Sequence, residues 1–157
     1  MKVKDLIKDD IQSASWWVND YVVSNMNFEI DEVEQVLNLN KILRNVYIST
    51  CFLDDVNNGG LDYYYDCSSG KFKDYLLEIF EEFDCGEMCE IIQKGNDIIS
   101  KVEERIGESI TDNIQEIDDE ESEEIQKLTY QINDLNENDR LYDYISAYVL
   151  KNLDSDI

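Results

Sequence analysis

Apolar residues recur along most of the chain at intervals of three and four positions, which places them on one face of an α-helix. The clearest stripe covers residues 88–106 and consists of Met88, Ile91, Ile92, Gly95, Ile98, Ile99, Val102 and Ile106. Similar stripes predict further helices, with the ranges 4–24, 31 to the Gly59–Gly60 pair, 69–83, 118–135 and 139–149. No stretch alternates apolar and polar residues as a strand does, and the sequence contains no proline. The pattern therefore predicts an all-α fold, a single compact multi-helix domain over residues 1–157.

Polar residues mark several of the predicted helix starts. Three Asp and Glu pairs have capping-box spacing, in which the first side chain accepts a hydrogen bond from the backbone of the second residue. The pairs are Asp31 with Glu34, Asp84 with Glu87, and Asp118 with Glu121. Ser69 is the expected cap of helix 69–83, and residues 107–116 are expected to form a loop or a short helix. The stripes predict a core that includes Val46, Phe80, Ile91, Ile98 and Tyr148.

The segment between the second and third predicted helices reads NNGGLDYYYDCSSG over residues 57–70. Glycine adopts positive φ without steric cost, so Gly59 and Gly60 predict a left-handed cap that ends the preceding helix. The tyrosines that follow are expected to fill the core at a tight helix–helix corner, because buried rings contribute much of a core's apolar area. The residues assigned to this structural corner are Asn58, Gly59, Gly60, Tyr64, Tyr65, Ser68 and Gly70.

The corner resembles the bacterial DNA-mimic family typified by DNA mimic protein nineteen. That family's pattern is Asn-Gly-Gly, an aromatic residue, glutamine, two aromatic residues, Asn-Ser and Gly before a helix, and the corner residues match it. Leu61, Tyr63 and Cys67 stand where the family has an aromatic residue, glutamine and asparagine. The resemblance extends more weakly from about Asp31 to Leu153. It implies a non-catalytic helical protein that occupies the DNA-binding site of a DNA-binding protein and inhibits it.

Acidic residues are concentrated in the second half of the chain. The sequence has 37 Asp and Glu against 13 Lys and Arg, a formal net charge of −24. Residues 103–124, here called the acid segment, have Arg105 as their single base. The acids of the segment are Glu103, Glu104, Glu108, Asp112, Glu116, Asp118, Asp119, Glu120, Glu121, Glu123 and Glu124. They form either a solvated surface that aids solubility or a face that docks a basic partner, and the resemblance favours the second.

Carboxylates on helices can imitate the charge pattern of DNA. Duplex DNA carries one charge per ~1.7 Å of axis, which proteins contact through Lys and Arg. Successive helical turns repeat surface acids every ~5.4 Å, so a rigid helical body presents rows of negative charge. Such a surface repels nucleic acid, so the expected partner is a basic DNA-binding protein and not DNA itself. An immunity protein that neutralises a basic toxin is the alternative function, and Glu78, Glu81 and Glu82 are an alternative docking row.

The sequence lacks the residue patterns of common catalytic and metal sites. It has no histidine, the commonest general base near neutral pH. Ser68–Lys71 lacks the first glycine of a phosphate-binding loop, and a calcium loop aligned on Asp55–Asp66 has one glycine in a ligand position. The four cysteines lack the paired short spacings of zinc modules and are expected to be reduced, packed thiols. We therefore expect no enzymatic activity, no cofactor and no metal.

Two further expectations concern location and assembly. No run approaches the ~20 apolar residues of a membrane span, and the first residues lack the apolar core of a signal peptide, so we expect a cytoplasmic protein. A mimic that faces a two-fold symmetric DNA-binding protein gains from being two-fold itself, and the typical family member is dimeric. The expected homodimer joins near residues 13–28, in the less acidic half, through Trp16, Trp17, Tyr21 and Val22.

Overall fold

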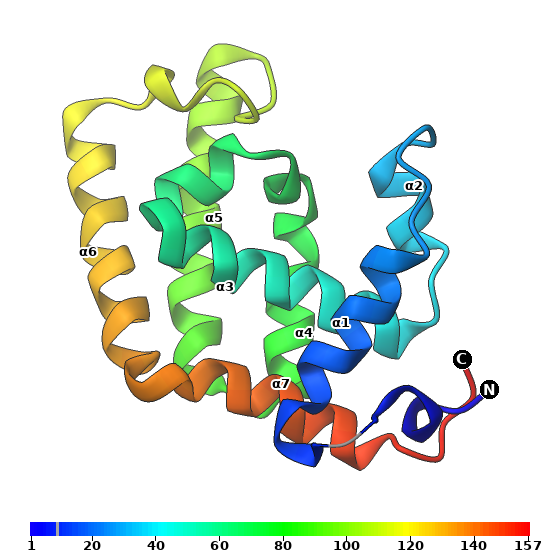
Figure 1. Cartoon of the computed structure of the whole chain (residues 1–157). Helices are drawn as coiled ribbons and strands as arrows, with labels where there is room; N and C mark the ends of the chain where they lie inside the picture. The colour runs from blue at the N-terminus through cyan, green and yellow to red at the C-terminus, as the bar shows by residue number, and fades with distance from the viewer. Residues whose placement is uncertain (9) are drawn as a thin grey trace.

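The helices predicted from the apolar stripes are present, although several boundaries differ. The computed structural model describes residues 1–8 and 10–157, and within this range the chain forms seven α-helices and no β-strand. The α-helices are α1 (Ala14–Ser24), α2 (Glu32–Leu37), α3 (Lys41–Asp66), α4 (Leu76–Glu82), α5 (Gly86–Ile106), α6 (Asp119–Leu135) and α7 (Arg140–Lys151). Five short 3-10 segments are η1 (Val3–Leu6), η2 (Ile11–Ser13), η3 (Ser68–Tyr75), η4 (Ile114–Glu116) and η5 (Glu137–Asp139). The all-α prediction is confirmed (Figure 1).

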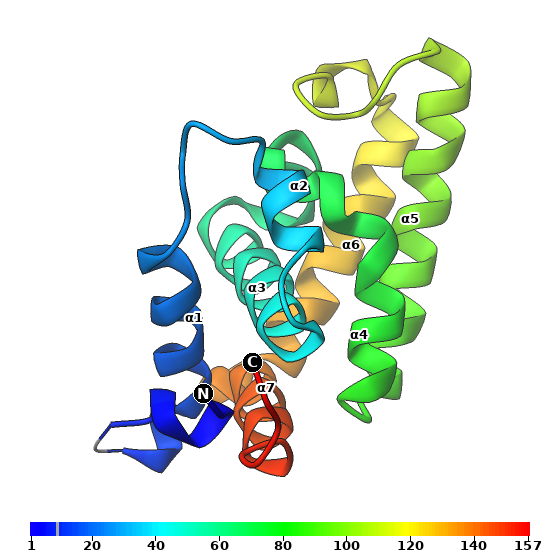
Figure 2. The ribbon, with the colours of Figure 1, turned by 90° about the vertical axis from the view of Figure 1, so that its right-hand side faces the viewer.

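The long helix α3 lies at the centre of the molecule and packs against α1, α6 and α7. The antiparallel helices α5 and α6 pack side by side on one flank, joined by the loop at the top of Figure 1. In the perpendicular view, α1 lies on the opposite side of α3 from α4 and α5 (Figure 2). The two chain ends meet far from that loop, where Lys2 and Asp156 form an isolated antiparallel bridge.

The Gly59–Gly60 corner is a kink in α3, at which two helical stretches meet. Gly60 has φ 93° and ψ 178°, a backbone conformation that is essentially restricted to glycine. Helical geometry resumes at Leu61, whose N–H donates to the hydroxyl of Thr129 on α6 at 3.0 Å. The predicted break with positive φ is therefore confirmed, whereas the left-handed cap is wrong, because ψ of Gly60 is 178° and not near the left-handed helical value of about 47°. Of the remaining small and polar corner residues, Gly70 is buried, and Asn58, Gly59 and Ser68 are exposed.

The two tyrosines after the kink fill the core, as predicted. Tyr64 is fully buried and packs edge-on against Phe52, with ring centroids 4.9 Å apart. Tyr65 is also buried, and its hydroxyl donates to Oδ1 of Asn96 on α5 at 2.9 Å. A β-carbon at Gly95 would lie 2.5 Å from the Tyr65 hydroxyl, so only glycine lets α5 approach the ring this closely.

The first two predicted helices are both interrupted. The range 4–24 contains two 3-10 segments before α1, and Asp10 stabilises one of them by accepting a hydrogen bond from the N–H of Gln12. The second range contains α2, a break and then α3, which begins where Asn40 accepts from the N–H of Ile42 at 2.8 Å. The apolar spacing persists across both breaks, whereas short Asp and Asn side chains bond to the nearby backbone and favour a new helix start.

The predicted capping box of α6 is confirmed, and that of α2 forms only one of its two bonds. Asp118 accepts from the N–H of Glu121, and the Glu121 side chain accepts in return from the N–H of Asp118. Asp31 accepts from the N–H of Glu34 at 3.0 Å, which is the first bond of its predicted box. The expectation of a loop or short helix after α5 is also confirmed, since this stretch contains η4.

The predicted caps between α3 and α5 are wrong. Ser69 lies inside η3, so the range 69–83 begins as 3-10 helix and becomes α-helical only at Leu76. Asp84 has φ 56°, and α5 begins after Cys85, so the predicted box of Asp84 and Glu87 does not form. Among the five named core residues, Val46, Phe80, Ile91 and Tyr148 are buried. Ile98 is only half-buried, because it faces a groove between α5 and α6.

Candidate protein-docking surface

The acid segment lies at one end of the α5–α6 pair. It comprises the last turn of α5, the loop with η4 and the first turns of α6, at the top of Figure 1. Nine of its acids are exposed, namely Glu104, Glu108, Asp112, Glu116, Asp118, Asp119, Glu120, Glu123 and Glu124. The other two, Glu103 and Glu121, are half-buried and bind cations of the chain itself. The candidate docking face therefore consists of the nine exposed acids.

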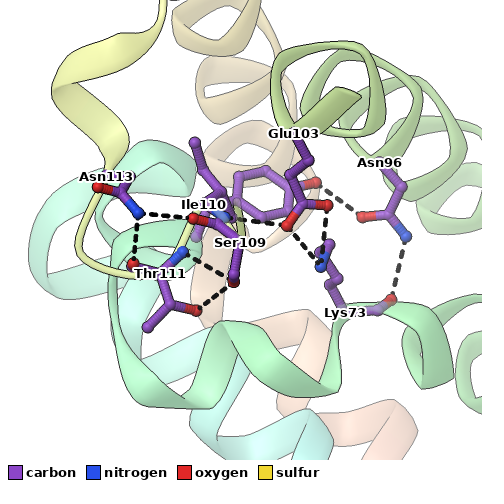
Figure 3. Close-up of polar contacts among 8 residues, drawn as sticks. Lys73, Asn96, Glu103, Ser109, Ile110, Thr111 and Asn113 are labelled. Atoms are coloured by element: carbon purple, nitrogen blue, oxygen red, sulfur yellow. Dashed lines mark hydrogen bonds and ion pairs between the residues drawn. The ribbon is translucent and has the colours of Figure 1, made fainter. Parts of the chain in front are cut away.

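Glu103 anchors the loop of the acid segment to η3 and α5. Its carboxylate lies 3.4 Å from Nζ of Lys73, and the two side chains are 23% and 12% exposed. The same carboxylate accepts a hydrogen bond from the N–H of Ile110 at 2.9 Å (Figure 3). Because Ile110 is fully buried, the loop cannot lift away without exposing an apolar side chain. Glu103 is thus committed to the fold and is not available to a partner.

The network continues from Lys73 to the tyrosine corner. Asn96 on α5 donates to the carbonyl oxygen of Lys73 at 3.0 Å and accepts from the hydroxyl of Tyr65 at 2.9 Å. Figure 3 shows Asn96, Lys73 and Glu103 linked in this way beneath the loop. The corner, η3, α5 and the loop are therefore joined by one set of hydrogen bonds.

Two further residues fix the backbone of the loop. Asn113 donates to the carbonyl oxygen of Ser109 at 2.8 Å and closes a tight turn (Figure 3). Asp66, at the end of α3, accepts from the N–H of Asp112 with its carbonyl oxygen and from the N–H of Ile114 with its carboxylate, both at 3.1 Å. These bonds hold the exposed acids of the loop in fixed positions before any partner arrives.

Arg105, the single base of the acid segment, is engaged within the fold. Its guanidinium donates twice to the carboxylate of Glu121, at 2.9 and 2.7 Å, and once to the carbonyl oxygen of Glu116 at 3.0 Å. The hydrogen bond from Arg105 holds the pKa of Glu121 below its usual range. Arg105 therefore neutralises a half-buried acid, and its charge is not free to offset the exposed ones.

The alternative docking row on α4 is more strongly compensated. Lys41 forms an ion pair with Glu82 and lies 4.0 Å from Glu78, whereas Glu81 is exposed. In the acid segment, the comparable pair is Glu123 with Lys127, at 3.8 Å and with both side chains well exposed. Such exposed pairs contribute little, typically about 0–1 kcal/mol. The acid segment is the stronger candidate.

The described residues include no group of three or more His, Cys, Asp or Glu side chains that could hold a metal ion. The range Asp55–Asp66, considered above as a calcium loop, is part of α3. The four cysteines are free; burial raises the pKa of Cys51 to about 12 and also raises the pKa of Cys67, Cys85 and Cys89. Such thiols resist forming the reactive thiolate.

No helix in the described part of the chain is long and apolar enough to cross a membrane.

The residues expected at a dimer contact differ in exposure. Trp16 is 56% exposed, Trp17 and Tyr21 are half-buried, and Val22 is only 2% exposed. Val22 is unavailable to a second chain because that side of α1 packs into the core, so the prediction of Val22 as a dimer-contact residue is wrong. Past the end of α1, Phe28 is also an exposed apolar residue, at 86%. A neighbouring groove of about 430 Å³ is lined by ten residues, among them Tyr21, Met26, Ile30 and Leu39.

Comparison with protein families supports the resemblance found at the corner. The family described as DMP19-like protein matches residues 37–152, well over half of the chain. The chain belongs to the DMP19-like protein family. The matched range contains α3 to α7, and with them the corner, the hydrogen-bond network and the acid segment, whereas α1 lies outside it. No match to the chain was found among curated proteins or among solved structures.

Proposed function

We propose that this protein is a non-catalytic DNA mimic that occupies the DNA-binding site of a basic DNA-binding protein and inhibits it. The observation that carries the proposal is the separation of the two kinds of acid in the acid segment. The half-buried acids neutralise Lys73 and Arg105, and nine exposed acids are left on a loop and a helix start with a fixed backbone. Membership of the DMP19-like protein family supports the same proposal.

A fixed array of carboxylates suits this role for two physical reasons. Phosphate contacts supply position and much of the affinity in protein–DNA complexes, so a mimic needs negative charge and no base edges. A surface that is already ordered avoids the entropy loss of ordering loops upon binding, which otherwise reduces affinity. The bonds from Glu103, Asp66 and Arg105 provide that order in the free protein.

The first experiment compares two variants of equal charge. One replaces four exposed acids of the segment by lysine, at Glu104, Glu108, Glu116 and Glu120. The control replaces four exposed acids outside both candidate docking rows, at Glu34, Asp74, Glu137 and Asp143. Glu121 is left intact, because its reversal would break both the Arg105 pair and the cap of α6. The partner protein is first captured from extract of the native host on the immobilised chain and identified by mass spectrometry.

The expected result is that reversal in the segment weakens the complex by at least about 100-fold, because like charges across an interface cost several kcal/mol. The control should weaken it far less. Duplex DNA should displace the captured protein from the chain. A partner that duplex DNA does not displace would instead indicate the immunity-type function, and equal effects of the two variants would show that the segment is only a solvated surface.

We also propose that two chains associate through the apolar surface around α1. Trp16 and Phe28 are exposed there, and Figure 2 places α1 on the opposite side of the molecule from the loop of the acid segment. A domain of this length has a radius of gyration of about 15 Å, whereas half-sites on DNA lie ~34–36 Å apart. Two chains joined at α1 would therefore present two acid segments, pointing outward, to a two-fold symmetric partner.

A further inference from the structure

A shallow groove runs between α5 and α6 on the side turned away from α3. Two cavities of about 400 and 300 Å³ form it, each lined by residues of these two helices alone. Gln131 lines both cavities, so they adjoin. The pair of Arg105 and Glu121 crosses from α5 to α6 above the groove, toward the acid segment. On the opposite face of the two helices, Gly95 and Thr129 contact α3.

The floor of the groove is apolar and repeats every two helical turns. It is formed by Ile91 and Ile98 of α5 and by Leu128 and Leu135 of α6. The members of each pair are seven residues apart, which corresponds to about 10.5 Å along a helix. Ile91 and Leu128 are buried by the chain itself, whereas Ile98 and Leu135 are half-buried and leave one apolar residue of each helix accessible on this floor. A helix laid into the groove repeats its own side chains at i and i+7 over the same distance.

The charges on the walls differ between the two halves. The cavity nearer the start of α5 is walled by three acids and no base, namely Glu87, Glu90 and Asp134. The other cavity has two acids and two bases, namely Asp97, Glu124, Lys94 and Lys127. Positive charge is therefore favoured at one end of the groove, whereas the other half is neutral on balance, so the groove distinguishes the two directions of a charged helix.

We infer that this groove docks one α-helix of the partner, with apolar residues at i and i+7 and with Lys or Arg gathered at one end. The inference rests on the proposed function, because it takes the partner to be a basic protein. DNA-binding proteins commonly read DNA with such basic helices. The apolar floor contributes burial that the acid segment lacks. A helix inserted in the reverse direction would place its Lys or Arg beside Lys94 and Lys127 and lose the contact with the three acids.

The test uses two synthetic helical peptides of identical composition. In the first, leucines occupy one face at i, i+4 and i+7 and lysines cluster at one end. In the second, the same leucines are distributed around the helix and the lysines stay in place. Each peptide carries a fluorescent label, and its binding to the full chain is followed by fluorescence anisotropy. The first peptide should bind at least about ten-fold more tightly, because only its pattern fits the floor.

Two double variants locate the site. Glu90→Lys with Asp134→Lys reverses the acidic wall and should reduce binding of the first peptide by at least about ten-fold. Asp74→Lys with Asp143→Lys makes the same change of charge outside both the groove and the acid segment and should leave the preference between the peptides intact. Equal affinity of the two peptides, or an equal loss of affinity in the two double variants, would refute helix docking in the groove. The DNA competition experiment is independent of this result, so the proposed function can stand while the groove fails.

Discussion

The pair of Lys73 and Glu103 leads to a quantitative prediction about the loop that carries the acid segment. Replacing Lys73 by methionine retains most of the apolar stem and removes the charge. It leaves a carboxylate that is 23% exposed without its cation, 3.4 Å away in the native protein. Removing one partner of a buried ion pair costs about 3–5 kcal/mol, and an exposed pair contributes about 0–1 kcal/mol. The partial exposure and the long contact place Lys73→Met between these limits, at about 1–3 kcal/mol.

The matched control is Lys71→Met, in the same 3-10 segment. Lys71 is exposed and forms no ion pair within the described residues, so its replacement changes the net charge equally and should alter stability by less than about 0.5 kcal/mol. For a chain of this size, 1 kcal/mol shifts the melting temperature by about 2–4 °C. Thermal unfolding followed by circular dichroism should therefore show a decrease of about 2–12 °C for Lys73→Met alone.

Hydrogen exchange separates a loosened loop from a generally weaker fold. The N–H of Ile110 donates to Glu103, so it should exchange faster in Lys73→Met, and the N–H of Leu61 at the kink should change less. If Lys73→Met and Lys71→Met melt together and exchange alike, the network does not position the loop, and the preordered docking face loses its support.

Three further predictions follow from the core, a half-buried acid and the apolar surface. Tyr64→Ala should destabilise the protein by about 3–5 kcal/mol in chemical denaturation, because it removes a buried ring. Tyr64→Phe should be neutral or stabilising in the same assay, because the buried hydroxyl has no hydrogen-bond partner among the described residues. Burial raises the pKa of Asp55, so its ionisation destabilises the native state once the pH rises above the unfolded pKa of about 3.9. Asp55→Asn removes that cost, so the stability of the variant relative to the native protein should be higher at pH 7 than at pH 3. Loss of that pH dependence would refute the argument from burial. Light scattering should give twice the chain mass of 18.4 kDa, and Trp16→Glu with Phe28→Glu should return it to the monomer value; a monomeric native protein would end the dimer proposal.

The apolar spacing in the sequence predicts the helices and most of the core correctly. It fails at helix ends and breaks, which polar side chains determine. The stripe of α5 identifies that helix almost to the residue, since its apolar face packs on α4 and α6. The sequence predicts a break at Gly60, but it does not predict that helical geometry resumes at Leu61. The hydroxyl of Thr129, which lets α3 continue, comes from a residue 68 positions away, and no local pattern reveals it.

The same limit applies to the candidate site. A count of acids identifies the acid segment, because 11 of them fall between residues 103 and 124. It does not identify which acids are exposed, because Glu103 is neutralised by Lys73 from a different helical segment. Glu121 could have been set aside from the sequence alone, since a capping box already engages its side chain. The groove between α5 and α6 was missed, because Ile98 fits the core stripe as well as its buried neighbours do.

The distribution of cations makes salt the sharpest discriminator between a docking face and a solvated one. Among the residues that the structure describes, seven of the 13 bases are held in ion pairs, and Arg44, Arg140 and Lys8 lie over aromatic rings, so few cations are left to oppose the exposed acids. Exposed charges are screened beyond ~10 Å at 0.1 M salt and ~3 Å at 1 M. Sodium chloride should therefore raise the melting temperature by relieving self-repulsion, and the same additions should weaken the complex with the basic partner. A face that only aids solubility predicts the first effect without the second. The half-buried pair of Lys73 and Glu103 is screened less than the exposed acids, so the loop should keep its hydrogen-exchange protection throughout the titration. Loss of protection in step with loss of binding would mean that salt dismantles the face, and the affinity change would then say nothing about mimicry of phosphate.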